Sequence, residues 1–290
     1  MVNLYRIIDF PTFINLIENR VEWFARPDSW EDKHEGYWFQ TLNSQEKIRK
    51  AVEILFTDVS PNNAGAAIQN FFKLWSIKYT CLGQCWSRTK ESDTLWKAIT
   101  PDKASVQIKT TETRLNNRLE CIKDAYSIFI KDVVYDLKGD NLLKKQAGSI
   151  KESKNTVEPY FHKRPCFSHE KEKRVILMDK QLSSFYIGAA FNKAGNEFNR
   201  AIDKKDKLSK EELIECISNE IVKTMSYIKL NNDNKGKAIL IDSKMKLSDY
   251  ITGVRVNPLA EDWIVSLVEV LCKKNGLKFC GKSDIYAVVK

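Results

Sequence analysis

The residues best suited to chemistry form a run of alternating charges near position 170. In a strand, successive side chains point to opposite faces, so Glu170, Glu172 and Arg174 would share one face. Two carboxylates this close raise each other's proton affinity unless a cation such as Arg174 lies between them. The pair can act as acid and base or can orient a ribose hydroxyl. The alternative is a solvated strand of alternating Lys and Glu.

The same run of residues also predicts a strand and the place of that strand in the sheet. We expect a strand over Cys166–Met178 whose charged half lies at an edge or mouth of the sheet, because only its second half is apolar on both faces.

A second candidate is the cation on the apolar first segment. Arg6 must find an anion or reach water. It can clamp a phosphate group, or it can pair with a carboxylate such as Glu172.

The third candidate is Cys85-Trp86-Ser87, at the end of a predicted strand. Ser87 there can hold a substrate hydroxyl or phosphate, or serve as a turn residue. No GxSxG motif surrounds it, and the chain has only three histidines, which disfavours a hydrolase. Trp86 and the tryptophans near it could wall a nucleobase, or could pack in the core.

An acidic segment precedes these motifs, with Asp32, His34 and Glu35 close together. Such residues can bind a divalent metal, but acidic loop residues more often cap helices, so we expect no metal. The sequence contains no CxxC pair, so a zinc site is disfavoured. In Glu170-Lys171-Glu172, glutamate stands where a common nuclease signature has lysine, which disfavours a metal-dependent nuclease.

Composition narrows the partners and the compartment. A net charge of +9 favours acidic partners, either nucleic acid or a nucleotide-bearing target, although acidic residues are interspersed and a solvated lysine-rich surface is the alternative. Seven cysteines at irregular spacing suit reduced thiols in the cytoplasm. No apolar run approaches the roughly 20 residues that span a bilayer, and the first residues do not resemble a signal peptide.

The pattern of elements predicts an α+β fold. Strands and helices interleave without a regular βαβ rhythm, so we expect a twisted mixed or mainly antiparallel sheet with helices packed around it, in one domain over residues 1–290. The polar stretch 138–156 is the best candidate for a mobile loop or a soft domain boundary. Ser209 and Glu212 form a capping box that opens a long amphipathic helix. Its apolar face suits the core, a homo-oligomer or an operon partner.

Several motifs together resemble a bacterial family catalogued as a domain of unknown function, number twenty-nine seventy-one in its series. They run in order through most of the chain: Leu4-Tyr5-Arg6, Pro27-x-x-Trp30-x-Asp32-x-x-Glu35, Cys85-Trp86-Ser87 with Leu95-Trp96, Phe167-x-x-Glu170-x-Glu172-x-Arg174, and Val254-x-Val256-Asn257-Pro258. Lys33 and Ala98-Ile99 depart from the family pattern. The family label implies no established activity.

The order of Arg6, Ser87 and the two glutamates is also similar to the Arg–Ser–Glu class of ADP-ribosyltransferases, which consume NAD. The resemblance implies that Arg6 holds phosphates and that Ser87 braces the nicotinamide end. It further implies that Glu172 contacts the ribose and stabilises an oxocarbenium-like transition state, while Glu170 activates the acceptor. Trp86-Ser87-Arg88 replaces the usual Ser-Thr-Ser.

These observations lead to one hypothesis and two rivals. The hypothesis is an NAD-consuming or ADP-ribosyl-transferring effector of a bacterial toxin or antiviral defence system, with Arg6, Arg174 and Trp86 binding the NAD. The rivals are a metal-dependent nucleic-acid-processing enzyme and a non-enzymatic binding or sensor module in which the charged row is structural.

Overall fold

A single large sheet organises the chain in the computed structural model, which describes residues 2–42, 44–58, 60, 62, 64–99, 103–139, 141–190, 208–227, 236–240 and 245–286. Within these ranges the strands are β1 (Asn3–Asp9), β2 (Val21–Ala25), β3 (Cys81–Ser87), β4 (Ser105–Thr111), β5 (Tyr126–Asp132), β6 (Glu172–Asp179), β7 (Gly236–Leu240), β8 (Gly253–Val256) and β9 (Phe279–Lys282).

The strands lie in the order β5-β6-β3-β1-β4-β8-β9, and β2 pairs with both β3 and β7. Among the described strands, every pairing is antiparallel except that of β8 with β9. The predicted α+β class, with a mixed and mainly antiparallel sheet, is therefore confirmed.

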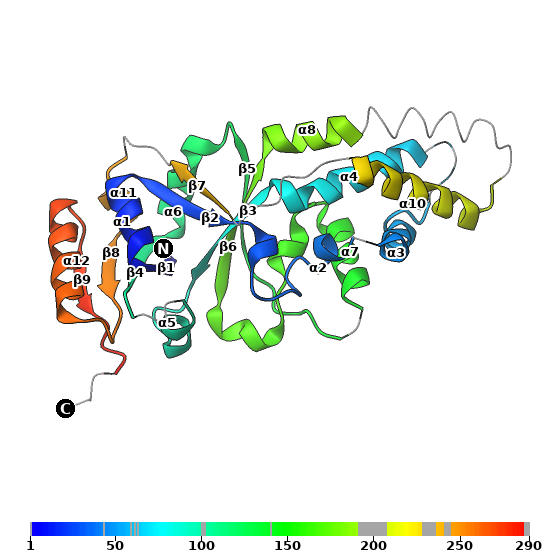
Figure 1. The fold of residues 1–290 in the computed structure, drawn as a ribbon. Helices are drawn as coiled ribbons and strands as arrows, with labels where there is room; N and C mark the ends of the chain where they lie inside the picture. Colours follow the sequence, from blue (N-terminus) through cyan, green and yellow to red (C-terminus); the bar gives the residue numbers. More distant parts are fainter. Residues whose placement is uncertain are drawn as a thin grey trace.

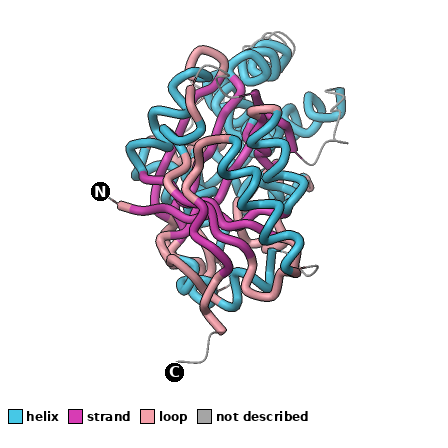
Figure 2. The backbone as a smooth tube through the Cα atoms, turned by 90° about the vertical axis from the view of Figure 1, so that its left-hand side faces the viewer, coloured by secondary structure: helices cyan, strands magenta, loops and turns pink. Residues whose placement is uncertain are grey.

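Helices cover both faces of the sheet, as the view along the molecule shows (Figure 2). The described α-helices are α1 (Phe10–Glu18), α2 (Tyr37–Thr41), α3 (Gln45–Leu55), α4 (Ala64–Thr80), α5 (Asp93–Ile99), α6 (Glu112–Leu119), α7 (Leu142–Ser153), α8 (Lys180–Ala190), α10 (Lys210–Tyr227), α11 (Leu247–Tyr250) and α12 (Asp262–Lys274). Short 3-10 helices are η1 (Pro27–Ser29), η3 (Glu120–Ile122), η4 (Glu158–Phe161) and η5 (Pro165–Glu170). No described helix is both long and apolar enough to cross a bilayer.

Two apolar cores lie on opposite sides of β6. Val175 and Leu177 belong to the core under α1, α6, α11 and α12, whereas Ile176 between them belongs to the core under α3, α4, α7 and α10. This division follows from the period-two alternation of a strand. Figure 1 shows the two groups of helices at opposite ends of the molecule. The single domain stays a prediction.

Local signals set several element boundaries as the sequence predicts. Asp9 ends β1 and caps α1, since its carboxylate accepts from the backbone N–H of Thr12 at 2.7 Å. The capping box of α10 is also confirmed. The Ser209 hydroxyl accepts from the N–H of Glu212, and the Glu212 carboxylate accepts from the N–H of Ser209.

The predicted mobile loop at 138–156 is wrong, because most of it forms α7. Gly139 and Lys154 flank this helix with positive φ angles of 75° and 53°. Its buried side carries only four residues, one of which is polar: Leu142, Gln146, Ala147 and Ile150. With so short an apolar stripe among lysines and serines, the helix resembles a loop in sequence.

The strand predicted over Cys166–Met178 is wrong in its first half. Residues 165–170 form η5, and β6 begins only at Glu172. The charged half does not lie at a sheet edge either, because β6 runs between β5 and β3. Pro165 explains the first error, since its fixed φ and missing N–H suit the start of a helical turn.

Gln146 gives α7 a testable role. Its side-chain oxygen accepts from the buried backbone N–H of Trp38 at 2.6 Å. Gln146→Ala should therefore lower the free energy of unfolding by about 1–3 kcal/mol, measured by urea denaturation. Lys144→Ala, at an exposed position of the same helix, should change it by less than about 0.5 kcal/mol. Equal effects of the two substitutions would contradict this role.

Candidate active site

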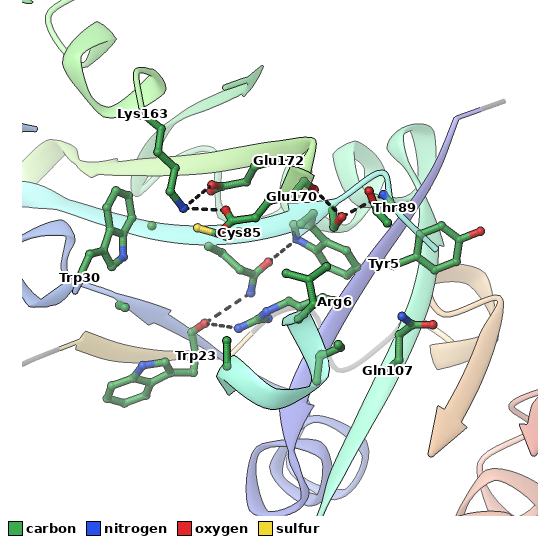
Figure 3. Close-up of a pocket in the computed structure, with 18 residues that line it drawn as sticks. Tyr5, Arg6, Trp23, Trp30, Cys85, Thr89, Gln107, Lys163, Glu170 and Glu172 are labelled. Atoms are coloured by element: carbon green, nitrogen blue, oxygen red, sulfur yellow. Dashed lines mark hydrogen bonds and ion pairs between the residues drawn. The ribbon is translucent and has the colours of Figure 1, made fainter. Parts of the chain in front are cut away.

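A cavity of about 310 Å³ opens over three adjacent strands, β6, β3 and β1 (Figure 3). It includes five of the six site residues predicted from the sequence: Arg6, Trp86, Ser87, Glu170 and Glu172. The sixth, Arg174, is not among the lining residues. The remaining walls of the cavity are mostly aromatic and apolar: Tyr5, Ile7, Trp23, Ala25, Trp30, Gly83, Leu95 and Ala98.

Sheet register brings these distant residues together. Tyr5 on β1 pairs with Ser87 on β3, and Ser87 pairs in turn with Glu172 on β6. One row across the sheet therefore carries Tyr5, Ser87 and Glu172, and Tyr5 is the residue directly before Arg6. Strands lie about 4.8 Å apart, so the β1 and β6 ends of the row are separated by about 10 Å.

One end of the cavity rests on a buried ion cluster, which consists of Glu35, Lys163, Glu170, Glu172 and Arg174. Arg174 is only 1 % exposed, and it donates to both oxygens of Glu172, at 2.7 and 2.8 Å. Its Nη2 also lies 2.7 Å from the Glu35 carboxylate. Arg174 therefore lies behind the cavity wall and orients Glu172 from beneath.

Lys163 completes this ion cluster from the cavity side. Its ammonium group lies 2.6 Å from Glu170 and 3.4 Å from Glu172 (Figure 3). It also lies 3.3 Å from Glu35. Burial lowers the pKa of Lys163, but the attraction of the three carboxylates outweighs burial and raises it above its usual range. Lys163 is therefore charged throughout the physiological range.

The two glutamates differ in protonation and in access. Burial raises the pKa of Glu172, but Arg174 and Lys163 outweigh burial and lower it to about 2. For Glu170 burial dominates, so its pKa is raised despite Lys163. Its side chain is also the more accessible, at 20 % exposed against 4 % for Glu172. Glu172 is thus a fixed anion, and Glu170 is the carboxyl group that can meet a ligand and exchange a proton.

Ser87 holds the turn that carries Glu170. Its hydroxyl donates to the Glu170 carbonyl at 2.6 Å and accepts from the N–H of Thr89 at 2.9 Å. Lys171 follows in a left-handed conformation, with φ 44°. This turn, and not strand alternation, is what directs both glutamates to one cavity. The predicted shared location is observed, but the predicted reason for it is wrong.

Cys85 also lines the cavity, between Ser87 and the ion cluster. The surrounding protein, together with the negative charge of Glu172, raises the pKa of its thiol above the usual range. The thiol is therefore protonated at neutral pH and is a poor nucleophile.

A second buried network supports the opposite end of the cavity. Glu22 is buried and accepts from Gln84 at 3.0 Å and from Tyr250 at 3.2 Å. Arg118 lies 3.4 Å from Glu22 and Arg6 lies 3.8 Å from it. Two guanidinium groups thus share the Glu22 carboxylate, and of the two only Arg6 lines the cavity.

Arg6 extends this second network into the cavity. Its Nη2 donates to the Trp23 carbonyl at 3.2 Å (Figure 3). Gln84 links the network to Trp86, whose ring N–H donates to the Gln84 oxygen at 2.9 Å. Arg6 therefore finds its anion in Glu22, and not in Glu172 as one alternative from the sequence proposed.

Trp30 forms an aromatic wall at the acidic end. The Arg174 guanidinium lies 4.2 Å from its ring centroid. A Cβ atom on Gly83 would lie 2.4 Å from the indole, so only glycine lets the ring pack this closely on β3. Trp86 is almost fully buried and contributes a cavity wall as well as core packing.

Asp32 lies outside the cavity. It accepts from Arg164 at 3.0 Å and pairs with the His34 ring at 2.9 Å. Burial raises the pKa of Asp32, but these hydrogen bonds outweigh burial and lower it. Among the described residues, no group of three or more His, Cys, Asp or Glu side chains is arranged to hold a metal ion.

Sequence reasoning missed Lys163, Glu22 and Gln84. Lys163 stands in a segment with several other cations and carries no motif. Glu22 and Gln84 offered a weak signal, since each is a polar residue within an otherwise apolar predicted strand, where burial requires a partner.

No family model, no curated protein sequence and no solved structure matches the chain. The two resemblances described above therefore depend on their quoted motifs alone.

The depressed pKa of Glu172 predicts a pH-dependent effect on stability. Its folded pKa of about 2 lies below the ordinary 4.5, so the ionised carboxyl stabilises the fold above about pH 4.5 and loses this effect as the pH falls towards 2. At pH 7, Glu172→Gln should lower the free energy of unfolding by about 3 kcal/mol, because it leaves buried cations without their anion.

Urea denaturation between pH 7 and pH 3 measures this difference, which should shrink as the pH falls. Glu120→Gln is the matched control, since Glu120 forms an exposed ion pair with Lys123 and should contribute less than about 1 kcal/mol throughout. A difference for Glu172→Gln that does not vary with pH would contradict the depressed pKa.

Proposed function

We propose that the chain is an NAD-consuming enzyme that releases nicotinamide and transfers ADP-ribose to an acceptor. The observation that carries this proposal is the opposite charge at the two ends of one aromatic-walled cavity. The ion cluster has three carboxylates and two cations, hence one negative charge in excess. At the other end the cation that lines the cavity is Arg6, whose guanidinium lies 3.8 Å from the buried Glu22 carboxylate.

NAD carries the complementary charges in the same order. Its nicotinamide ring is cationic while bound to ribose, and a pyrophosphate follows that ribose. An excess negative charge beside the ribose stabilises positive charge that develops there in the transition state. Donors of the Arg6 guanidinium can bind phosphate oxygens in charge-assisted hydrogen bonds.

Glu170 is best suited to contact the ribose. Lys163 holds one of its side-chain oxygens, Oε2, and the other, Oε1, has no hydrogen bond or ion pair within the described part of the chain. That oxygen can accept a hydrogen bond from a ribose hydroxyl. Glu172 has both oxygens engaged by Arg174, so its role in this proposal is to hold Lys163 and to supply fixed negative charge. Glu170 thus takes the ribose contact that the resemblance gave to Glu172.

The reaction balances without a redox partner. The bond between ribose C1′ and the nicotinamide nitrogen breaks, its electron pair stays on the nitrogen, and nicotinamide leaves as a neutral molecule. A lone pair of water or of an acceptor then forms the new bond to C1′. The proton that the acceptor loses goes to Glu170, whose raised pKa favours uptake.

The size of the cavity limits what it encloses. A volume of about 310 Å³ is at the lower end of the range for small-molecule sites. The nicotinamide and its ribose fit such a volume, and the adenosine half would lie outside. A chain of net charge +9 attracts polyanions, so the acceptor we propose is nucleic acid or a nucleotide-bearing molecule.

The first test measures nicotinamide release. The protein incubated with NAD should produce free nicotinamide, detected by mass spectrometry, and Glu170→Gln should reduce the rate about 100-fold or more because the transition-state contact is lost. Glu158→Gln is the control, since Glu158 also pairs with a lysine, Lys131, but lies outside the cavity.

The outcomes of these assays distinguish the proposal from the non-enzymatic module and the metal-dependent enzyme. The control variant should keep the wild-type rate. Neither nicotinamide nor a modified acceptor from the wild-type protein, over a range of acceptors that includes DNA and RNA, would refute the enzymatic proposal. Wild-type binding of NAD without turnover would support the non-enzymatic module. Nucleic-acid cleavage abolished by a chelator would support the metal-dependent rival.

Arg6 should govern affinity for NAD. Because hydrogen bonds to charged groups contribute about 1.5–3 kcal/mol, Arg6→Ala in the Glu170→Gln background should weaken binding about 10- to 100-fold by calorimetry. Arg114→Ala is the matched control, since Arg114 also donates to a backbone carbonyl but lies outside the cavity. Equal affinities for the two variants would contradict a phosphate-binding role for Arg6.

A further inference from the structure

The outer face of α12 carries an exposed apolar row. Trp263 and Val270 are 59 % and 62 % exposed, and Leu267 between them is 38 % exposed. Leu259, just before the helix, extends the row and is also exposed. These four residues are called the α12 seam below. The opposite side of α12, with Ile264, Val268 and Cys272, is buried against the sheet.

Spacing distinguishes the α12 seam from scattered surface apolar residues. Within the helix, positions 263, 267, 270 and 274 are spaced by four, three and four residues, which is the repeat of a two-helix seam. Such a row fits another helix lying nearly parallel or antiparallel to α12. By contrast, a globular surface without a partner has no reason to keep this period.

The position of α12 leaves the seam accessible. The helix forms one end of the molecule, with β8 and β9 on its inner side (Figure 1). β9 is itself the last strand of the described sheet path. A helix from a second molecule can therefore approach without displacing any described element.

The charges at the two ends of α12 favour a second α12 helix as its partner, in antiparallel orientation. α12 starts with Glu261 and Asp262 and ends with Lys273 and Lys274. In an antiparallel pair of α12 helices, the acidic start of each lies beside the basic end of the other. A parallel pair would set like charges together. The helix dipoles also favour the antiparallel arrangement.

The seam is symmetric about a single point. A two-fold axis between Ser266 and Leu267 sets Trp263 opposite Val270 of the second copy. Leu267 then meets its own counterpart near the axis. The three seam residues on the helix, Trp263, Leu267 and Val270, each gain an apolar contact in this register, as an isologous interface requires.

We infer that two copies of this chain associate through antiparallel α12 helices. The helix from Trp263 to Lys274 is about 16 Å long. An interface built on it alone involves fewer than the 20–30 residues a side of a standard interface, so the dimer should be weak, with a Kd in the micromolar range.

Sedimentation of the full chain tests this inference. Between about 1 and about 100 µM, the range over which a micromolar Kd is populated, the mass should rise from the 33.6 kDa of the chain towards twice that value. Trp263→Glu and Val270→Glu should each keep the chain monomeric, because each buries a charge opposite an apolar residue. Thermal melting that matches the wild type would show that both variants fold.

Phe185→Glu is the matched control. Phe185 is a large apolar residue on α8, 65 % exposed and outside the seam, so this variant should dimerise like the wild type. Asp262→Lys should weaken the dimer at least several-fold, and Lys273→Asp added to it should restore association. A wild-type chain that is monomeric throughout, or a dimer that survives both seam substitutions, would overturn the inference. Failure of the double reversal would overturn the antiparallel direction.

Discussion

The cavity depends on one buried ion pair, between Glu172 and Arg174. Both groups have lost nearly all contact with water, and their two short hydrogen bonds offset part of the cost of that desolvation. Arg174 also lies over the Trp30 ring and donates to the Tyr160 carbonyl. The same guanidinium therefore fixes a carboxylate, an aromatic wall and η4. Without it, the buried carboxylates would repel one another and the acidic end of the cavity would lose its geometry.

β6 couples this ion pair to the stability of the whole fold. The strand carries Glu172 and Arg174 at its start and then Val175, Ile176 and Leu177, which alternate between the two cores. Any shift of the strand by one residue would exchange its core faces and would move the charges as well. The position of the ion pair is thus set by apolar packing along the same strand, and a rigid site follows from the fold without further support.

Much of this arrangement was accessible from the sequence, for identifiable reasons. A strong local signal predicted the capping box at Ser209. The grouping of Arg6, Ser87 and the glutamates followed from motif order. Lys163 and α7 were not predictable, since neither differs from ordinary lysine-rich surface until tertiary contacts are known. For Glu170 the predicted location beside Glu172 is observed, but a turn at Lys171 causes it. Strand periodicity cannot reveal such a turn.

In the proposed function, net charge and local charge act on different steps of binding. The surplus of +9 acts over long range and raises the encounter rate with polyanions, an effect that salt screens. Inside the cavity the nearest charges dominate, since they act over a few ångströms and in a medium of lower dielectric constant. An acidic end can therefore persist in a basic protein, and it favours a ligand with a local positive charge. A pure polyanion is repelled at that end. A nucleotide with a cationic ring and phosphates is attracted both by the acidic end and by the positive net charge.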